Sequence, residues 1–272
     1  MSEQINNCEN ESAAWWSTDI IDMSPGVIRF RGHPIENLIG NVSFAQMIWF
    51  MVRGDMPNKE QAYLFECALV SSVDHGPQAP SIAAARMAAT CGLGLNNVIA
   101  TAVNMLGDSH GGAGEQCVEL YHEIKKRQEA GQPLTLAVRE GLADWISEHG
   151  KFVPGYGHRF HKPIDPRSPR LLQLVDDAAS NGVVSGDFAV IGRQVEKELT
   201  EQKGGHAIPM NIDGATAVIF AELGFPAPLA RGIFCLSRSV GILAHGWEQM
   251  QQGGRNKGPI PRKYLPKYTG LK

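Results

Sequence analysis

The feature that most constrains the fold is the recurrence of apolar residues at spacings of three and four, which is typical of helices with one buried face. It is clearest over residues 187–203, where the apolar positions are Phe188, Ile191, Val195 and Leu199. The period-two alternation of strands is nearly absent, apart from a short run at 27–30 after a Ser-Pro-Gly turn. The sequence therefore predicts a mainly α protein.

Similar patterns, interrupted by glycine-rich hinges, predict eight further helices. They cover residues 44–53, 59–73, 81–91, 114–128, 136–148, 168–179, 215–223 and 228–251. A chain of 272 residues fits one large domain. We expect residues 1–24 to form an N-terminal extension and residues 25–272 to form the main domain, with a small lobe inserted at roughly 155–215.

The predicted helix at 228–251 carries an apolar stripe and a buried charge. The stripe comprises Ile233, Leu236, Val240, Leu243 and Trp247. Arg238 and His245 lie on the opposite face, which also holds Gly241 and Ile242, so we expect burial on most sides. A buried guanidinium needs an anion. For Arg238, the residues alone leave open an internal carboxylate or a bound one.

Charge, cysteine usage and apolar run length exclude several classes of protein. The 25 basic and 28 acidic side chains give a net charge of -3, unlike a general nucleic-acid binder. Five widely spaced cysteines with no C-x-x-C pair are typical of reduced cytoplasmic thiols. The first 25 residues lack Lys and Arg, unlike a signal peptide, and apolar runs are too short for a membrane span. We therefore expect a cytoplasmic protein without membrane or nucleic-acid partners.

The last 22 residues form a basic tail with no acidic side chain. Its cations are Arg255, Lys257, Arg262, Lys263, Lys267 and Lys272, which give it a charge of +6. A contact with an anion and a solvated basic terminus both fit this pattern.

Histidines gather in glycine-flanked, turn-like segments. Four of them are His75, His110, His158 and His206. Each alone fits a hydrogen-bonded loop histidine, whereas together they indicate a cleft where backbone approaches a ligand closely.

The segment 153–167 combines His158 and His161 with Arg159, Lys162 and Arg167, which predicts an anionic ligand. The H-x-x-H spacing lacks further ligands, so we expect no metal, and neither a P-loop nor a serine-hydrolase motif is present.

Asp213 follows Met-Asn-Ile in an apolar setting before a predicted helix. It is either a simple N-cap or an acid whose pKa burial raises toward a useful value for proton transfer.

These segments resemble the citrate synthase superfamily in order and spacing. The likeness covers roughly residues 25–270 and rests on Arg31–Ile35, Gly54–Pro57, Ser109–Ala113, Pro154–Arg159, Asp165–Arg167, Asn211–Asp213 and Ser237–Gly241. Within the superfamily, Asp74–Pro77 and Asn211–Gly214 resemble the citryl-CoA lyase module of ATP citrate lyase, and the short chain agrees. Ser109–Gly112 and Ile260–Lys263 are more similar to synthases.

The resemblance implies a multi-helical fold with a small lobe closing over a cleft, and carbon–carbon bond chemistry on an acyl-CoA. By the family pattern, His158 takes the hydroxyl proton, His110 hydrogen-bonds the thioester oxygen and Asp213 protonates the enol carbon. No metal and no permanently bound cofactor is implied; the coenzyme A thioester is a substrate.

The resemblance also assigns binding residues. The substrate carboxylates are expected to meet His75, Arg167, Arg238 and Arg262, the last from a neighbouring subunit of a homodimer or larger homo-oligomer. Coenzyme A is expected to contact Pro154, Gly155, Tyr156, Gly157, Arg159 and Lys162.

The first interpretation is a citryl-CoA lyase-type enzyme that cleaves citryl-CoA, or a relative such as citramalyl-CoA, to acetyl-CoA and a 2-oxo acid. The second is a short citrate or 2-methylcitrate synthase that condenses an acyl-CoA with oxaloacetate. The third is a non-catalytic family member.

Overall fold

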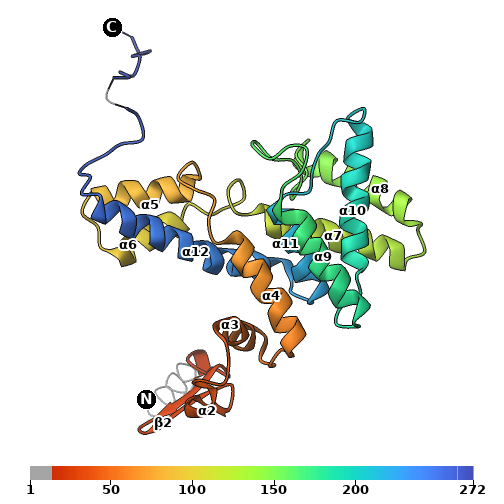
Figure 1. Ribbon diagram of the computed structural model, residues 1–272, viewed down its shortest axis with the longest axis horizontal. Coiled ribbons are helices and arrows are strands. Elements are labelled where there is room, and N and C mark those ends of the chain that lie inside the picture. The colour runs from red at the N-terminus through yellow and green to blue at the C-terminus, as the bar shows by residue number, and fades with distance from the viewer. Residues whose placement is uncertain (1–13, 262, 272) are drawn as a thin grey trace, which may run out of the picture. The chain divides into compact units, whose positions relative to one another are not determined.

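The computed structural model describes residues 14–261 and 263–271, and this part of the chain contains eleven helices and one small sheet (Figure 1). The prediction of a mainly α fold is confirmed. The chain divides into two compact units, Met1–Tyr63 and Leu64–Lys272. Residues 155–215 do not separate from the rest of the second unit, so the inserted small lobe stays a prediction.

The first unit contains a three-stranded antiparallel sheet with the strands in chain order. Its strands are β1 (Ile21–Ser24), β2 (Val27–Phe30) and β3 (His33–Pro34). Gly26, with φ of 77°, closes the turn between β1 and β2 in a conformation that favours glycine. The strand predicted at 27–30 is β2. The expected boundary after residue 24 falls at this turn and would separate two paired strands.

Three helices follow the sheet: α2 (Ile35–Leu38), α3 (Phe44–Arg53) and α4 (Lys59–Ser72), the last of which continues into the second unit. Ser43 and Gln46 form a capping box at the start of α3, and Gly54 ends it in the left-handed conformation. These strong signals explain why the bounds predicted for α3 agree with the structure.

The second unit contains eight further helices. They are α5 (Pro80–Thr90), α6 (Leu95–Val103), α7 (Ala113–Glu129), α8 (Leu134–His149), α9 (Arg167–Ser180), α10 (Asp187–Gln202), α11 (Ile212–Glu222) and α12 (Ala227–Gln251). Seven of them were predicted within a few residues. Helix α6 was not, because it is short and includes Asn96 and Asn97, which are weak helix formers.

Helix α12 is the long element of this unit. It packs against α5 and α6 in one region and against α7 in another (Figure 1). A buried cluster of small and branched residues joins α12 to α5 and α6, and includes Ile82, Val98 and Ile242. Helix α11 lies in the interior against α7, α9 and α10, and its residues from Gly214 to Ala221 are all buried.

Burial on most sides of α12 was expected, but most of its apolar stripe is exposed. Ile233 is buried, but Leu236, Val240, Leu243 and Trp247 are between 41% and 58% exposed. The buried face instead carries Arg238, Gly241 and Ile242. Helix α12 is also long and apolar enough to span a membrane by length and composition alone, although its packing against α5, α6 and α7 is that of a core helix.

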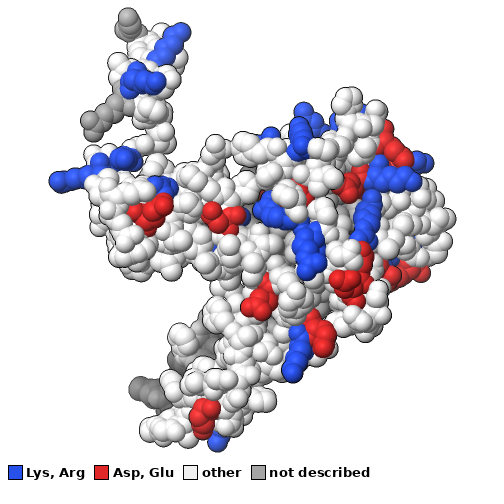
Figure 2. Space-filling view, viewed as in Figure 1, with Lys and Arg blue, Asp and Glu red and all other residues white. Residues whose placement is uncertain are grey.

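The surface of the second unit carries both signs of charge. On the face shown in Figure 2, lysine and arginine side chains lie beside aspartate and glutamate side chains. Several of these form ion pairs, such as Arg193 with Asp176 and Lys125 with Asp187. This interspersed pattern contrasts with the segment that follows α12, which is basic along its whole length.

Candidate active site

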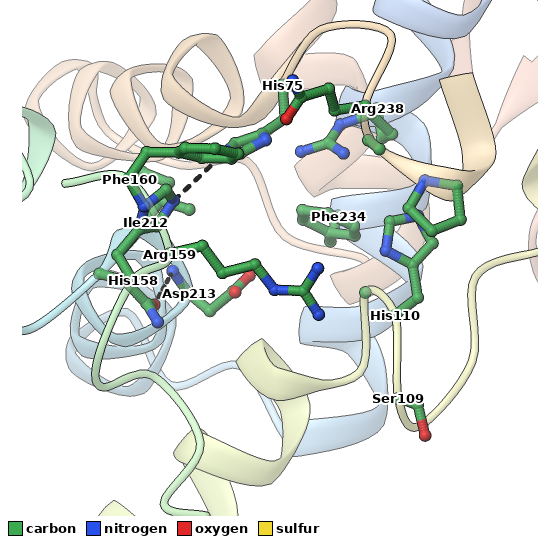
Figure 3. A pocket seen from close by; sticks show the side chains of 15 residues that line it. His75, Ser109, His110, His158, Arg159, Phe160, Ile212, Asp213, Phe234 and Arg238 are labelled. Atoms are coloured by element: carbon green, nitrogen blue, oxygen red, sulfur yellow. Dashed lines mark hydrogen bonds between the residues drawn. The ribbon is translucent and has the colours of Figure 1, made fainter. Parts of the chain in front are cut away.

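One pocket of the second unit, with a volume of about 340 Å³, collects the chemically informative side chains. Its walls come from the segment before α5, the turn before α7, the loop before α9, the start of α11 and the middle of α12. The charged and titratable side chains that line it are His75, His110, His158, Arg159, Asp213 and Arg238 (Figure 3). The structure therefore brings together side chains from five separate parts of the sequence.

His158 and His75 lie next to each other in the pocket wall. Their Nε2 atoms are 3.1 Å apart, and their ring centroids are separated by 5.2 Å. Nδ1 of His158 accepts hydrogen bonds from the backbone N–H groups of Phe160 and His161. Burial lowers the pKa of His158, and the neighbouring His161 lowers it further, so the neutral imidazole is favoured.

His110 lies on the turn before α7 and contacts the N-terminus of α5. The backbone N–H of Ser81 donates to its Nε2 at 3.2 Å, and the Ser81 hydroxyl is 2.9 Å from the same atom. Burial lowers the pKa of His110, and the charge of Arg238 adds to this effect. An Nε2 that accepts the Ser81 N–H carries no proton, so the neutral ring has its proton on Nδ1 and offers a hydrogen-bond donor there.

Asp213 belongs to the first turn of α11, where Asn211 is the N-cap. The Asn211 side chain accepts from the N–H groups of Asp213 and Gly214, which leaves the Asp213 carboxyl for the pocket. Burial raises the pKa of this carboxyl, although Arg238 and Arg167 oppose the shift. The N-cap interpretation thus applies to Asn211, and Asp213 has the environment of a proton-transfer group.

Two glycines fix the His158 loop against the start of α11. A Cβ atom on Gly155 would lie 2.6 Å from Cys117 Sγ and 2.7 Å from Gly214 Cα. A Cβ on Gly214 would lie 2.5 Å from the carbonyl oxygen of Gly155. The backbone N–H of Asn211 donates to that same carbonyl. The backbones can approach this closely only because neither residue has a side chain.

Arg238 is buried in the middle of α12, with 3% of its surface exposed. Its Nε donates to the carbonyl oxygen of Ser72 at 3.0 Å, and its guanidinium lies 4.9 Å from the ring centre of Phe234. Within the described residues, no Asp or Glu forms an ion pair with it. Because a buried, uncompensated guanidinium is costly, this arrangement favours the bound-carboxylate interpretation over an internal salt bridge.

Arg167 is arranged differently. It lines a second pocket of about 550 Å³, which shares His75 with the first pocket and also includes His161. Its Nε and Nη2 donate to the two oxygens of Asp165, whose side chain is fully buried. Burial alone would raise the pKa of Asp165, but the hydrogen bonds from Arg167 lower it overall. Only Nη1 of Arg167 is left outside this bidentate pair.

The residues expected to contact coenzyme A fall into two groups. Pro154, Gly155 and Tyr156 are buried and do not line the pocket. The Tyr156 hydroxyl lies 2.7 Å from that of Tyr121 and donates to the Gly192 carbonyl, so this ring is part of the core. The expected adenine contact therefore does not fit these three residues.

The remaining members of that set lie nearer the surface. Arg159 is exposed and extends into the pocket toward the side that holds His110 (Figure 3). Gly157 is partly exposed, and its N–H donates to the Pro209 carbonyl. Lys162 is exposed but lines neither of the two pockets around His75. Arg262 lies outside the described residues.

Several pocket residues were not singled out from the sequence. Ser81, Gln78, Phe160 and Phe234 support or line the site. The N-cap pattern of Asn211 before Asp213 could have been found from sequence, whereas Ser81 touches His110 only through the tertiary fold. Among residues 14–261 and 263–271, no group of three His, Cys, Asp or Glu side chains could hold a metal ion.

Four kinds of group thus surround one cavity. They are the neutral hydrogen-bond donor His110, the carboxyl of Asp213 with its raised pKa, the histidine pair and the buried guanidinium of Arg238. These groups can transfer a proton to or from carbon, hold a developing enolate oxygen and bind a carboxylate.

Comparison with known proteins supports this description. The family model "Citrate synthase, C-terminal domain" matches residues 8–72 and 57–262. The citrate synthase of Acidithiobacillus ferridurans is 30% identical over 250 residues, which are 88% of this chain and 61% of that protein. The citrate synthase of Haloferax volcanii is 28% identical over 233 residues, which are 85% of this chain and 56% of that protein. The chain thus spans somewhat more than half the length of these curated relatives.

Among solved structures, citryl-CoA lyase from Hydrogenobacter thermophilus matches with a TM-score of 0.81 and 32% identity. The match covers 94% of this chain and 95% of that one. ATP citrate lyase from Methanosaeta concilii, solved with (3S)-citryl-CoA, shares the fold at a TM-score of 0.77 and 21% identity, with 42% of its chain covered. The chain described here belongs to the citrate synthase family.

Proposed function

We propose that this protein is a lyase that cleaves citryl-CoA, or a related 3-hydroxyacyl-CoA such as citramalyl-CoA, into acetyl-CoA and a 2-oxo acid. The observation that carries the proposal is the convergence of His110, His158 and Asp213 on one pocket that also holds the unpaired guanidinium of Arg238. The near-complete coverage of the Hydrogenobacter thermophilus citryl-CoA lyase favours the lyase direction.

The reaction moves one proton from oxygen to carbon. When the 3-hydroxyl group loses its proton, the electron pair of the O–H bond forms the ketone and the C2–C3 bond breaks. That bonding pair forms the enolate of acetyl-CoA, whose oxygen accepts a hydrogen bond from Nδ1–H of neutral His110. Asp213 then donates its proton to the enolate carbon, a step that the raised pKa of this carboxyl favours.

The proton acceptor belongs to the histidine pair. Both His75 and His158 have lowered pKa values, and the first cause in each case is burial. An imidazole that is neutral at neutral pH is able to accept the hydroxyl proton at the start of the reaction. Cleavage therefore requires that Asp213 is protonated and that both histidines of the pair are neutral.

Arg238 is proposed to bind a carboxylate of the substrate, with Nη1 of Arg167 and the second pocket available to another. Arg159, which extends into the first pocket, is proposed to contact the phosphates of coenzyme A. The free carboxylates and the coenzyme A phosphates of the thioester would then be bound by several cations.

The test is to incubate the purified protein separately with citryl-CoA and citramalyl-CoA and to identify products by mass spectrometry. Acetyl-CoA with a 2-oxo acid supports the lyase, and the faster substrate identifies the acid. Asp213→Asn serves as the inactive control. A synthase remains the second candidate because the curated relatives are citrate synthases. Free CoA from acetyl-CoA and oxaloacetate would favour it, and no turnover in any assay would favour a non-catalytic role.

We also propose a homodimer or larger homo-oligomer. The exposed stripe on α12, defined by Leu236, Val240, Leu243 and Trp247, is an apolar surface of the kind that subunits bury. Sedimentation analysis of the wild type and of Val240→Asp tests this proposal. We expect the variant to shift toward monomer while its helical circular dichroism stays unchanged. A monomeric wild type would reject the proposal.

A further inference from the structure

We infer that His75, rather than His158, accepts the hydroxyl proton of the substrate, and that the backbone amides of residues 160 and 161 impose this assignment by fixing the tautomer of His158. The inference rests on the proposed function, because it names the base in that reaction. It departs from the family pattern, which implies His158 as the base and gives His75 only a binding role.

Nδ1 of His158 is a hydrogen-bond acceptor in this structure. Two backbone N–H groups, from Phe160 and His161, donate to this atom at 3.1 and 3.0 Å. An imidazole nitrogen that accepts a hydrogen bond carries no proton, so the neutral His158 ring has its proton on Nε2. His158 therefore has no free lone pair: Nδ1 is occupied by the loop backbone, and Nε2 is a donor.

The Nε2–H of His158 points toward Nε2 of His75, 3.1 Å away. For this contact to be a hydrogen bond, Nε2 of His75 must be the acceptor, and the proton of neutral His75 must lie on Nδ1. Without substrate, the lone pair on His75 Nε2 accepts from His158, and it is the one basic site of the pair that a substrate hydroxyl can take over. A substrate hydroxyl that enters between the rings would accept from His158 and donate to His75.

This geometry gives a balanced step. The hydroxyl proton moves to His75 Nε2, while the O–H electron pair forms the ketone and the C2–C3 bond breaks as described above. The new ketone oxygen keeps its hydrogen bond from His158 Nε2–H throughout. His158 thus stabilises the developing oxyanion without changing its protonation state, and His75 becomes an imidazolium that later returns its proton to solvent.

The surroundings of His75 fit a base. Asp74 Oδ2 accepts from the Gly76 N–H and from His245, which holds the turn that carries His75. The ionisable groups that act on its charge are His110, His158, His161, Asp165, Arg167 and Arg238. Burial, followed by the two arginines, lowers the pKa of His75, so its lone pair is available at neutral pH.

The kinetic test compares His75→Gln with His158→Gln in the citryl-CoA cleavage assay over a range of pH. A glutamine at 158 still offers an N–H donor, so we expect a loss of about tenfold and an unchanged acid limb of kcat/KM. A glutamine at 75 cannot accept a proton, so we expect a loss of about 10²–10⁴ and disappearance of that limb. The matched control is His206→Gln, because His206 is an exposed loop residue whose Nδ1 lies within hydrogen-bond distance of the Lys203 carbonyl. Its kcat/KM should equal that of the wild type at every pH.

Two further measurements separate a missing base from a distorted site. Added imidazole should partly restore His75→Ala but not His158→Ala. Nitrogen-15 NMR of labelled histidines, assigned with the glutamine variants, should show His158 protonated on Nε2 and His75 on Nδ1 in the free wild type.

The outcomes are distinct. If wild type cleaves citryl-CoA but His158→Gln is the variant that loses the acid limb, or if NMR shows His158 protonated on Nδ1, this inference is wrong and the lyase stands. If the wild type cleaves neither citryl-CoA nor citramalyl-CoA, the proposed function is wrong, and the assignment of His75 as the base is wrong with it.

Discussion

The two halves of the pocket are built on different supports. His110 and Asp213, to which we assign the thioester end of the substrate, both meet a helix N-terminus: His110, on the turn before α7, accepts from the first turn of α5, and Asp213 belongs to the first turn of α11. His75 and His158, assigned to the hydroxyl, lie on loops that are held by side-chain and backbone hydrogen bonds. Helix ends supply fixed dipoles that need no reorganisation, whereas loops adjust when a ligand binds.

The same contrast separates the two arginines. Arg238 lies in the middle of α12 and forms no ion pair with a carboxylate in the described part of the chain, while Arg167, the first residue of α9, is already paired with Asp165 of the preceding loop. We therefore expect substitutions in the helix-mounted half to reduce catalysis with little effect on stability. Substitutions in the loop half should affect both.

The largest effect is expected for Asp213→Asn, in the helix-mounted half. Loss of the proton donor should lower kcat by about 10²–10⁴. A carboxyl whose folded pKa is raised destabilises the folded state above its unfolded pKa, so the free energy of unfolding at neutral pH should stay equal or increase. Denaturation and turnover measurements check both. Asp187→Asn, in the exposed first turn of α10, is the control and should remain active; a large stability loss in Asp213→Asn would contradict this prediction.

Arg238→Leu should be the next most severe. The substrate carboxylate would lose a buried charged partner, which corresponds to a decrease in kcat/KM of roughly 30-fold to several thousand-fold. Stability should change little, because leucine removes a buried charge that forms no ion pair with a carboxylate in the described residues. Steady-state kinetics and urea unfolding provide the comparison. A strongly destabilised variant would show that Arg238 is needed for folding rather than for the ligand.

Asp165→Asn tests the loop half. It breaks the bidentate contact with Arg167 and should lower the free energy of unfolding by about 1–3 kcal/mol while raising KM. Because the pKa of Asp165 is lowered in the folded state, this stability is present above the ordinary carboxyl pKa and is lost as pH falls through the lowered value. Urea titrations at neutral and acid pH measure the difference, and equal losses at both would refute the linkage.

The pH dependence of cleavage by the wild type should reflect one titrating group from each half of the pocket. Cleavage needs Asp213 protonated and His75 neutral, and the pKa of Asp213 is raised while that of His75 is lowered. Activity should therefore rise with pH as the histidine loses its proton, and fall as Asp213 loses its own. The profile of kcat/KM against pH is therefore expected to have two limbs, one for each group. A profile that rises steadily into the alkaline range would exclude Asp213 as the proton donor.

The smallest effect is expected for His245→Ala. His245 is 3.2 Å from Asp74, which in turn holds the turn of His75. Loosening this turn should raise KM by a few-fold and leave the shape of the pH profile unchanged, since no proton-transfer group is removed. Gln251→Ala, at the exposed end of the same helix, is the comparison variant. A change in the pH limbs of His245→Ala would instead assign a direct proton-transfer role to it.

Sequence patterns predicted most helices because caps and glycines mark their ends. The capping box of Ser43 and Gln46, with Gly54 after the last turn, defines α3 from local chemistry alone. Strand β1 was missed because all four of its residues are exposed, so no alternation marks it. The stripe on α12 was assigned to the core because periodicity shows that residues share a face without showing which face is buried.

The site was less accessible to sequence reasoning where its geometry depends on tertiary contacts. The family resemblance pointed to His110, His158 and Asp213, which the fold places around one pocket. It could not indicate that Tyr156 turns toward Tyr121 inside the core, because that direction is set by packing between α7 and α10. The pairing of Asp165 with Arg167 likewise depends on a loop conformation that spacing does not specify.

The contact between Gly155 and Gly214 bears on how this family member can evolve. The two backbones leave no room for a methyl group on either side, so the loop of His158 and the helix start of Asp213 are joined as one mechanical unit. A substitution at either glycine would move the two reactive groups apart together with their supports. Variation in substrate choice is therefore expected elsewhere around the cavity, at positions such as Gln78, which lines it without belonging to this contact.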